Sequence, residues 1–406
     1  MNRAPRVLGR LAPRTLRGRL SLVALTTAAL LITVLTVVFN AKDALATDAP
    51  APAPADRPPA DRATAWLRRR LGRAAVLSYA AALFVPGPGL WLRRPHPLPL
   101  GHALHPPVST APLLLSLVLF AAGLQVPVHA LGGLLRRPAA LMAGLALHLT
   151  MPLLAVPAVA FLLRLTPDTD GGSGLVTAMI LIVAMPVAAG ATVWTGKGDG
   201  DQPTMVGLVL ASTLLSPLTI PLVVRALVPL LSDGYATRLT RTAHTAHGGF
   251  ALLGVVVPCA AGILCRLALP APGLRRVSGV VLPVALYGSL LLTYVNASGA
   301  LGSFLTRPRP LLFAAALAVA IVVCLLSFAA GRCAGRLLRL DAPAASSLTL
   351  ACGMNNSSAS AVLITTALPD KPHLLLPVLA YGLLQKTAAG RVVRGTRPPR
   401  GASARS

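Results

Sequence analysis

Glutamate is absent from this 406-residue sequence, so its 11 acidic residues are all aspartates. None of these aspartates lies inside the long apolar segments described below. General acid–base catalysis needs a positioned titratable group, and hydrolytic or phosphate chemistry usually carries a recognisable motif. The chain has no GxSxG, HExxH or phosphate-loop spacing, and its GKGDGDQP stretch shares only glycine content with such a loop. We therefore predict that the protein is not an enzyme.

Cysteine and aromatic residues are also scarce. The five cysteines form no CxxC pair and lie in or near apolar segments, which argues against a disulfide framework or a metal site. Aromatic residues make up only 4% of the chain. The apolar segments are long and unbroken, whereas a membrane β-barrel needs alternating apolar and polar positions. A barrel is therefore excluded.

Apolar residues and arginine are abundant. Hydrophobic residues make up 55% of the chain and the mean hydropathy is +0.72, which is typical of a helical protein that crosses a membrane several times. The net charge of +26 comes mostly from arginines in loops and tails. Membrane topology explains this pattern better than a nucleic-acid-binding face does. We predict an all-α membrane protein that contacts the lipid bilayer and no nucleic acid.

The N-terminal part of the chain differs from the rest. Residues 20–40 form an apolar run of spanning length after an arginine-rich start, and residues 46–60 form a Pro/Ala linker. The run is an uncleaved anchor, a cleavable signal or an interfacial segment. Four parts are expected: an N-terminal segment (1–65), a first half (66–235), a second half (236–395) and a basic cytoplasmic tail (396–406).

Ten apolar segments follow the linker, separated by proline-rich or charged stretches. Their approximate bounds are 74–92, 111–131, 139–163, 174–195, 204–230, 246–268, 278–298, 310–331, 344–367 and 373–390. Lys and Arg are roughly twice as frequent on one side of these segments as on the other. The positive-inside rule then places both ends of the core in the cytoplasm of a bacterial-type inner membrane.

The ninth segment has an unusual centre. It carries no charge from Ala344 to Leu368, yet its middle reads GMNNSSAS between Gly353 and Ser360. Polar side chains inside hydrocarbon need partners, and glycine followed by two asparagines favours a break in the helix. Interrupted helices near mid-membrane are where secondary transporters bind substrates and ions. The alternative is that small and polar residues only allow close helix packing.

The fourth segment shows a similar signal, because Pro186 and Gly190 lie in its middle. Proline removes a backbone donor and kinks or breaks a helix. Five segments in each half make the halves inverted relative to one another, so segments four and nine occupy equivalent places. The sequence predicts ten core transmembrane helices in two inverted five-helix repeats, with broken helices at crossings 4 and 9. An ordinary proline kink is the alternative at crossing 4.

Several motifs resemble the bile acid:sodium symporter family, part of the bile/arsenite/riboflavin transporter superfamily. GMNNSSASA and LPVLAYGLLQ at 376–385 are similar to its ninth and tenth crossings. The Lys197–Asp199 turn and the Ser212–Thr213 pair are similar to the parts that follow its fourth break. The resemblance implies sodium-coupled symport of organic anions, with crossings 1, 2, 6 and 7 forming a panel and the others a core.

The chain departs from the family at an important position. The resemblance places a glutamate that links the family's sodium sites at the position of Ala351, and no other glutamate can replace it. His148 lies near a family glutamine that helps to bind sodium. Histidine titrates near neutrality, so His148 is a candidate proton carrier, with a neutral, hydrogen-bonded histidine as the alternative. Na⁺ is the candidate coupling ion, and no other cofactor or metal is expected.

Two sets of candidate site residues follow. The substrate-binding candidates surround the two breaks, where helix N-termini suit an anion: Pro186, Gly190, Thr192, Gly353, Asn356 and Ser358. The ion-binding candidates offer hard oxygen atoms or a titratable ring: Thr192, Ser212, Thr213, Asn355, Asn356 and His148. Asn296, near the end of the seventh segment, is predicted to be a cap or packing residue.

The predicted function is secondary active transport, of symporter type, of a small organic anion across the inner membrane. Proton-coupled or uncoupled transport of the auxin-efflux or arsenite type is an alternative within the same class. A membrane sensor that keeps the fold without transporting is an alternative from another class. The identity of the solute and the oligomeric state are left open.

Overall fold

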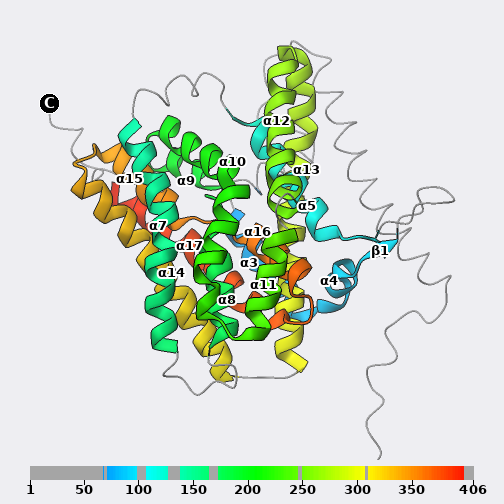
Figure 1. Cartoon of the computed structure of the whole chain (residues 1–406). Helices are drawn as coiled ribbons and strands as arrows, with labels where there is room; N and C mark the ends of the chain where they lie inside the picture. The colour runs from blue at the N-terminus through cyan, green and yellow to red at the C-terminus, as the bar shows by residue number, and fades with distance from the viewer. Residues whose placement is uncertain are drawn as a thin grey trace, which may run out of the picture. The chain divides into compact units, whose positions relative to one another are not determined.

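The computed structural model describes residues 67, 71–97, 107–126, 138–163, 172–245, 249–306 and 310–396 (Figure 1). The apolar run at 20–40, the linker at 46–60 and the end of the basic tail lie outside these residues. Leu71–Leu269 and Ala285–Ser406 form one compact unit, which holds every contact described below. Pro270–Val284 is assigned to a second unit.

The architecture is helical, as predicted, apart from a pair of two-residue antiparallel strands, β1 (His96–Pro97) and β2 (Pro107–Val108). The helices up to residue 245 are α3 (Leu71–Phe84), α4 (Pro86–Arg93), α5 (Thr110–Leu124), α7 (Pro138–Leu163), α8 (Ser173–Val183), α9 (Ala191–Lys197), α10 (Gln202–Leu227), η2 (Val228–Leu230) and α11 (Asp233–Thr245). Those that follow are η3 (Gly249–Val256), α12 (Val257–Ala268), α13 (Ala271–Thr306), α14 (Pro310–Leu337), α15 (Ala342–Gly353), α16 (Ser357–Ala367), η4 (Pro372–Leu374) and α17 (Leu375–Thr396).

Several of these helices are suited to a membrane. Five within the described residues are long and apolar enough to cross one: Ala139–Phe161, Gln202–Leu230, Phe250–Ala268, Ala271–Gly302 and Pro310–Leu337. Their length matches the roughly 20 residues needed to span a hydrocarbon core. Three shorter apolar helices are Thr110–Leu124, Ser173–Val183 and Ser357–Ala367. The predicted multi-pass character is therefore supported, while the count of ten crossings in two repeats stays a prediction.

The first predicted segment, 74–92, is not one straight helix. Helices α3 and α4 meet at an angle of 93°. The bend falls where Val85 is followed by the sequence PGPG, and Pro86 and Pro88 lack the N–H groups that would continue the helix. The segment is therefore a bent pair of helices. Asn296, predicted to be a cap or packing residue, is buried inside α13, well before the end at Thr306, so the cap alternative does not hold and the packing alternative stays a prediction.

Helix α8 lies at the centre of the compact unit. All of its residues from Ser173 to Val183 are buried, and it packs against α7, α14, α16 and α17 (Figure 1). By contrast, α10 leaves Leu214, Leu218 and Leu222 exposed on one side, as expected for a lipid-facing surface. An apolar helix that is buried all round is a core element. The end of α8 therefore emerges in the protein interior.

Helices α5 and α12 approach each other backbone to backbone. A Cβ atom on Gly123 would overlap the carbonyl oxygen of Cys259, and a Cβ atom on Gly262 would overlap that of Phe120. Arg266 Nη1 also donates to the Leu124 carbonyl oxygen at 3.0 Å. Small residues let membrane helices approach backbone to backbone in this way. We call this reciprocal pair of glycines the glycine contact.

Candidate functional site

Two short non-helical segments lie at the positions where the sequence predicts helix breaks. Helix α8 ends at Val183 and α9 begins at Ala191, so residues 184–190 lie outside both helices. Helix α15 ends at Gly353 and α16 begins at Ser357, which leaves residues 354–356 between them. That each segment interrupts a single membrane crossing stays a prediction. We call the two segments together the crossover.

The two segments of the crossover pair with each other. Val187 and Asn355 form an antiparallel bridge. Ala188 N donates to the Met354 carbonyl oxygen at 2.7 Å, and Asn356 N donates to the Pro186 carbonyl oxygen at 2.9 Å. Backbone groups released from a helix inside a membrane must find partners within the protein. Backbone groups of each segment therefore find hydrogen-bond partners in the other segment. This pairing brings the predicted residues Pro186, Asn355 and Asn356 together.

Two buried serines make hydrogen bonds at the crossover and at the end of α8 that precedes it. Ser212 on α10 accepts a hydrogen bond from Val187 N at 3.1 Å, and its hydroxyl donates to the Val209 carbonyl oxygen at 3.2 Å. Ser360 on α16 donates to the Leu181 carbonyl oxygen at 2.9 Å, near the end of α8. The structure thus gives the predicted candidate Ser212 a contact to the first segment.

Tyr381 on α17 is a site residue that the sequence analysis did not single out. Its hydroxyl donates to the Gly353 carbonyl oxygen at 2.9 Å and accepts from Asn355 Nδ2 at 3.3 Å. The side chain is fully buried. The available signal was a polar-tipped aromatic residue in an apolar helix, within the stretch LPVLAYGLLQ that carried the resemblance. Tyr381 supports Gly353, where α15 ends, and Asn355, where the bridge forms.

Helix α16 begins directly at the crossover. Asn356 is its N-cap, and its side-chain oxygen accepts from Ala359 N at 3.1 Å. Ser357 and Ser358 follow in the first turn and are half-buried. Gln385 Nε2 of α17 donates to Ser357 Oγ at 3.3 Å. The N-terminus of a helix carries partial positive charge, so this end favours an anionic group.

The remaining predicted residues of the fourth segment lie at the edge of this arrangement. Gly190 is exposed, and Thr192 is half-buried with its hydroxyl donating to the Ala189 carbonyl oxygen at 2.8 Å. Thr213 is buried on α10, next to Ser212 in sequence. A sodium cage needs several oxygen atoms around one point. Of the predicted ion-binding set, the structure connects Ser212, Asn355 and Asn356 through the crossover.

The turn after α9 docks onto the start of α15. Asp199 has a positive φ of 51° in the Lys197–Asp199 turn. Asp201 N donates to the Pro343 carbonyl oxygen at 3.2 Å, and Ser347 Oγ donates to the Asp201 carbonyl oxygen at 3.0 Å. The turn that follows α9 is therefore bonded to the start of α15, and α9 and α15 each flank one segment of the crossover.

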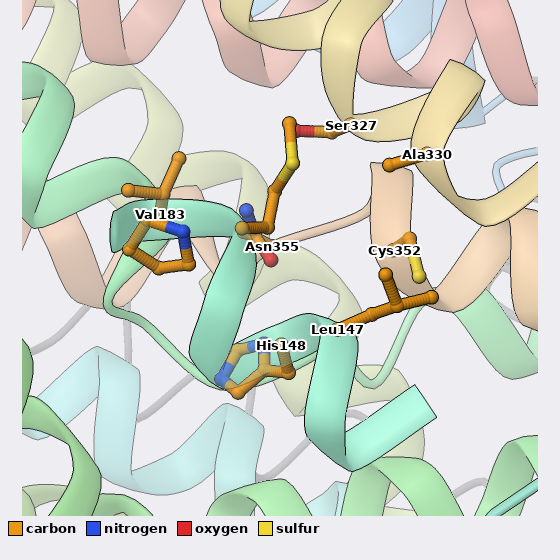
Figure 2. A pocket seen from close by; sticks show the side chains of 9 residues that line it. Leu147, His148, Val183, Ser327, Ala330, Cys352 and Asn355 are labelled. Atoms are coloured by element: carbon orange, nitrogen blue, oxygen red, sulfur yellow. The ribbon is translucent and has the colours of Figure 1, made fainter. Parts of the chain in front are cut away.

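A small cavity lies beside Asn355 (Figure 2). Four helices and the crossover line it with Leu147, His148, Met151, Pro152, Val183, Ser327, Ala330, Cys352 and Asn355. Figure 2 shows His148 and Ser327 on opposite sides of the Asn355 amide. The cavity is large enough for about one water molecule. It has no acidic lining residue, and the described part of the chain contains no cluster of three or more metal-binding side chains.

Together, apolar helices of spanning length and paired helix ends in the interior define a multi-pass membrane protein. Residues 112–307 match the family model described as "Sodium Bile acid symporter family". The family predicted from the motifs is therefore confirmed over this range. A match to this family indicates a transporter.

One curated relative supports the extent of the similarity. A protein of Bacillus subtilis (strain 168) named "Uncharacterized protein YbaS" is 24% identical over 279 residues, which cover 68% of this chain and 85% of the relative. The family match ends at residue 307, before α15 and α16. The second segment of the crossover, residues 354–356, therefore lies outside the matched range, and its geometry comes from the structure alone.

Proposed function

We propose that the protein is a secondary active transporter that moves a small organic anion across the inner membrane by alternating access. The observation that carries this proposal is the crossover, in which two segments from distant parts of the chain pair through the bridge between Val187 and Asn355. Transporters with interrupted helices bind their substrates at such places, because unwound backbone and helix ends supply polar groups without exposing them to lipid.

An anion is the favoured class of substrate because of the start of α16. Its first turn offers backbone N–H groups and the hydroxyl groups of Ser357 and Ser358 next to Asn356. A carboxylate accepts hydrogen bonds from such donors and is favoured by the helix dipole. The substrate-binding residues we propose are Pro186, Gly353, Asn356 and Ser358, with Gly190 and Thr192 at the rim.

The coupling ion follows from the family and from the residue at position 351. The family name refers to sodium, and Ser212, Thr213, Thr192, Asn355 and Asn356 are the neutral oxygen groups proposed for it. Ala351 is buried on α15 and supplies no charge. A neutral cage holds a monovalent cation less strongly than a carboxylate does. We therefore propose sodium coupling of low affinity, with proton-coupled or uncoupled transport as the outcomes to distinguish from it.

Uptake into proteoliposomes tests the function. The purified protein is reconstituted, and labelled acids are offered under an inward sodium gradient, an inward proton gradient or no gradient. The panel contains a bile acid and small pantoate-like and pyruvate-like acids. Accumulation driven by sodium supports the proposal. Equilibration without accumulation indicates an uncoupled carrier, and no uptake of any acid by folded protein favours a membrane sensor.

Substitutions at Asn356 connect uptake to the crossover. Asn356→Ser keeps a side chain that caps helices well, while Asn356→Ala removes both the cap and the amide. If the amide contacts the substrate, both variants should lose uptake. Asn356→Ser should still unfold at the wild-type temperature, because its side chain keeps the cap. A matched control is Asp341→Ala, which removes the cap of α15 at its end away from the crossover. Uptake by that control should continue. Normal uptake by Asn356→Ala would count against a substrate site here.

A further inference from the structure

The cavity beside Asn355 places His148 and Ser327, which the proposed transport site does not use, next to the Asn355 amide, which it does. Asn355 Nδ2 donates to Tyr381, so the amide oxygen is left to accept from a group in the cavity. Ser327 on α14 is 1% exposed, and its hydroxyl makes no direct hydrogen bond within the described part of the chain. It lies near the Tyr381 hydroxyl. Buried hydroxyl groups are costly to leave without a partner, so this cavity favours a polar occupant.

His148 of α7 faces the same cavity. Its lining contains one other titratable side chain, the Cys352 thiol, and neither acidic nor basic residues. A charged imidazolium ring would have no opposite charge here, and an unpaired charge in an apolar surrounding is strongly disfavoured. The ring is therefore neutral, with one nitrogen that donates a hydrogen bond and one that accepts.

The size of the cavity limits the occupant to one small species. About one water molecule fits, and a buried water is held where it finds two to four polar partners. His148, Ser327 and the Asn355 amide oxygen supply three. They belong to α7, α14 and the crossover, and the rest of the cavity lining consists of apolar side chains and Cys352 of α15.

Resting on the proposed function, we propose that these three residues hold one water molecule and that this water fixes Asn355 in the crossover. His148 is then a positioning residue of the transport site and not the carrier of a coupling proton. The water, Asn355 and Tyr381 form one hydrogen-bonded chain from α7 to the carbonyl oxygen of Gly353, where α15 ends.

Uptake kinetics of His148 variants test the positioning role. His148→Gln keeps a donor and an acceptor, whereas His148→Phe fills the space with an apolar ring. Thr150→Ala, on the exposed side of α7, is the control. We expect His148→Phe to raise KM about tenfold, the size of one lost buried hydrogen bond, and His148→Gln to stay within about twofold. The pH profile of His148→Gln should match that of the wild type.

Two kinetic outcomes would overturn the proposal. If His148→Gln loses as much uptake as His148→Phe and abolishes a pH dependence that the wild type shows, His148 carries a proton. If His148→Gln shifts the sodium concentration for half-maximal uptake more than it shifts KM for the acid, a cation occupies the cavity in place of water.

A double-mutant cycle on unfolding tests the same link without transport. The unfolding temperature in detergent is measured for His148→Phe, for Asn355→Leu and for the double variant. A water-mediated link makes the two effects non-additive, whereas Thr150→Ala combined with Asn355→Leu should be additive. Additive effects at His148 and Asn355 would refute the water link alone. Non-additive effects in a protein that transports no acid would refute the proposed function alone.

Discussion

The crossover and the glycine contact hold the chain together in opposite ways. In the glycine contact, α5 and α12 approach so closely at Gly123 and Gly262 that no side chain fits between their backbones. In the crossover, the backbones also meet, but through hydrogen bonds between groups that two helix ends have released. The glycine contact therefore depends on close packing of two backbones, and the crossover depends on hydrogen bonds between polar groups.

This difference indicates which regions can change during transport. Close backbone packing resists any added atom and has few alternative arrangements. Hydrogen bonds between unwound segments can exchange partners with a ligand, because each released N–H or carbonyl group remains a strong donor or acceptor. We therefore expect the glycine contact to be most sensitive to volume and the crossover to be most sensitive to loss of polar atoms.

The largest effect is expected at Gly262. Gly262→Leu places a side chain against the backbone of α5, which cannot move away as a flexible side chain could. Overpacking at such a site should lower the free energy of unfolding by at least about 3 kcal/mol, and much of the protein should fail to fold. Thermal unfolding in detergent measures the effect. Gly279→Leu is the control, because nothing lies within 4 Å of a Cβ atom at that helical position.

The next effect is expected at Tyr381. Tyr381→Phe removes only the hydroxyl, so shape is kept while Gly353 O and Asn355 Nδ2 lose their partner. Leaving buried groups unpaired should cost about 1–3 kcal/mol and reduce uptake. Thermal unfolding and proteoliposome uptake are measured together. Tyr287→Phe on α13 is a matched control, and an equal loss in both variants would contradict a special role for Tyr381.

A smaller effect is expected at Ser360, which joins α16 to the end of α8. Ser360→Ala removes a hydroxyl that reaches Leu181 O at 2.9 Å and Asn356 O at 3.2 Å, and Leu181 O lies in the last turn of α8, where carbonyl groups lack partners within the helix. The loss of stability should be about 1 kcal/mol, with uptake retained. Thr366→Ala, at an exposed position of α16, is the control and gives the loss of stability expected from any Ser or Thr to Ala change on this helix. A loss as large as that of Tyr381→Phe would show that α8 depends on this single bond.

The smallest effect is expected at Asp341, the exposed N-cap of α15. Its carboxylate accepts from Ala344 N at 3.0 Å. Asp341→Ala should reduce the unfolding free energy by about 0.5–1 kcal/mol, and Asp341→Asn should restore most of it because both residues cap well. Thermal unfolding measures both variants. No recovery with Asn would indicate that the charge matters more than the cap.

The sequence predicted the parts of this protein that depend on local chemistry. Pro186 and the Gly353–Asn356 stretch marked the two non-helical segments. Proline lacks the backbone N–H of a helix, and glycine and asparagine favour non-helical backbone, so both effects act at the residue itself. The helical class followed from apolar composition. The PGPG sequence at residues 86–89 also carried a local signal for the bend between α3 and α4, although the segment was predicted to be a single span.

The parts that depend on distant segments did not follow from the sequence. Nothing near Val187 specifies Asn355 as its partner, and nothing near Tyr381 indicates that its hydroxyl reaches Gly353. Nor does the sequence indicate that the Thr192 hydroxyl donates to the Ala189 carbonyl oxygen within its own turn. Contacts of this kind arise from the packing of whole helices, which local propensity does not describe.

The short length of α8 has a consequence for the synthesis of the protein. Its 11 residues span about 16 Å, roughly half of the hydrocarbon thickness, so α8 alone is too short to cross a membrane. Its hydrogen-bond partner Ser360 follows Leu181 by 179 residues. At translation rates of about 5–20 residues per second, the end of α8 waits roughly 9–36 seconds for that partner. During this interval the ribosome-bound first half is incomplete, and it depends on water, lipid headgroups or the insertion machinery to shield the polar backbone that α16 later covers.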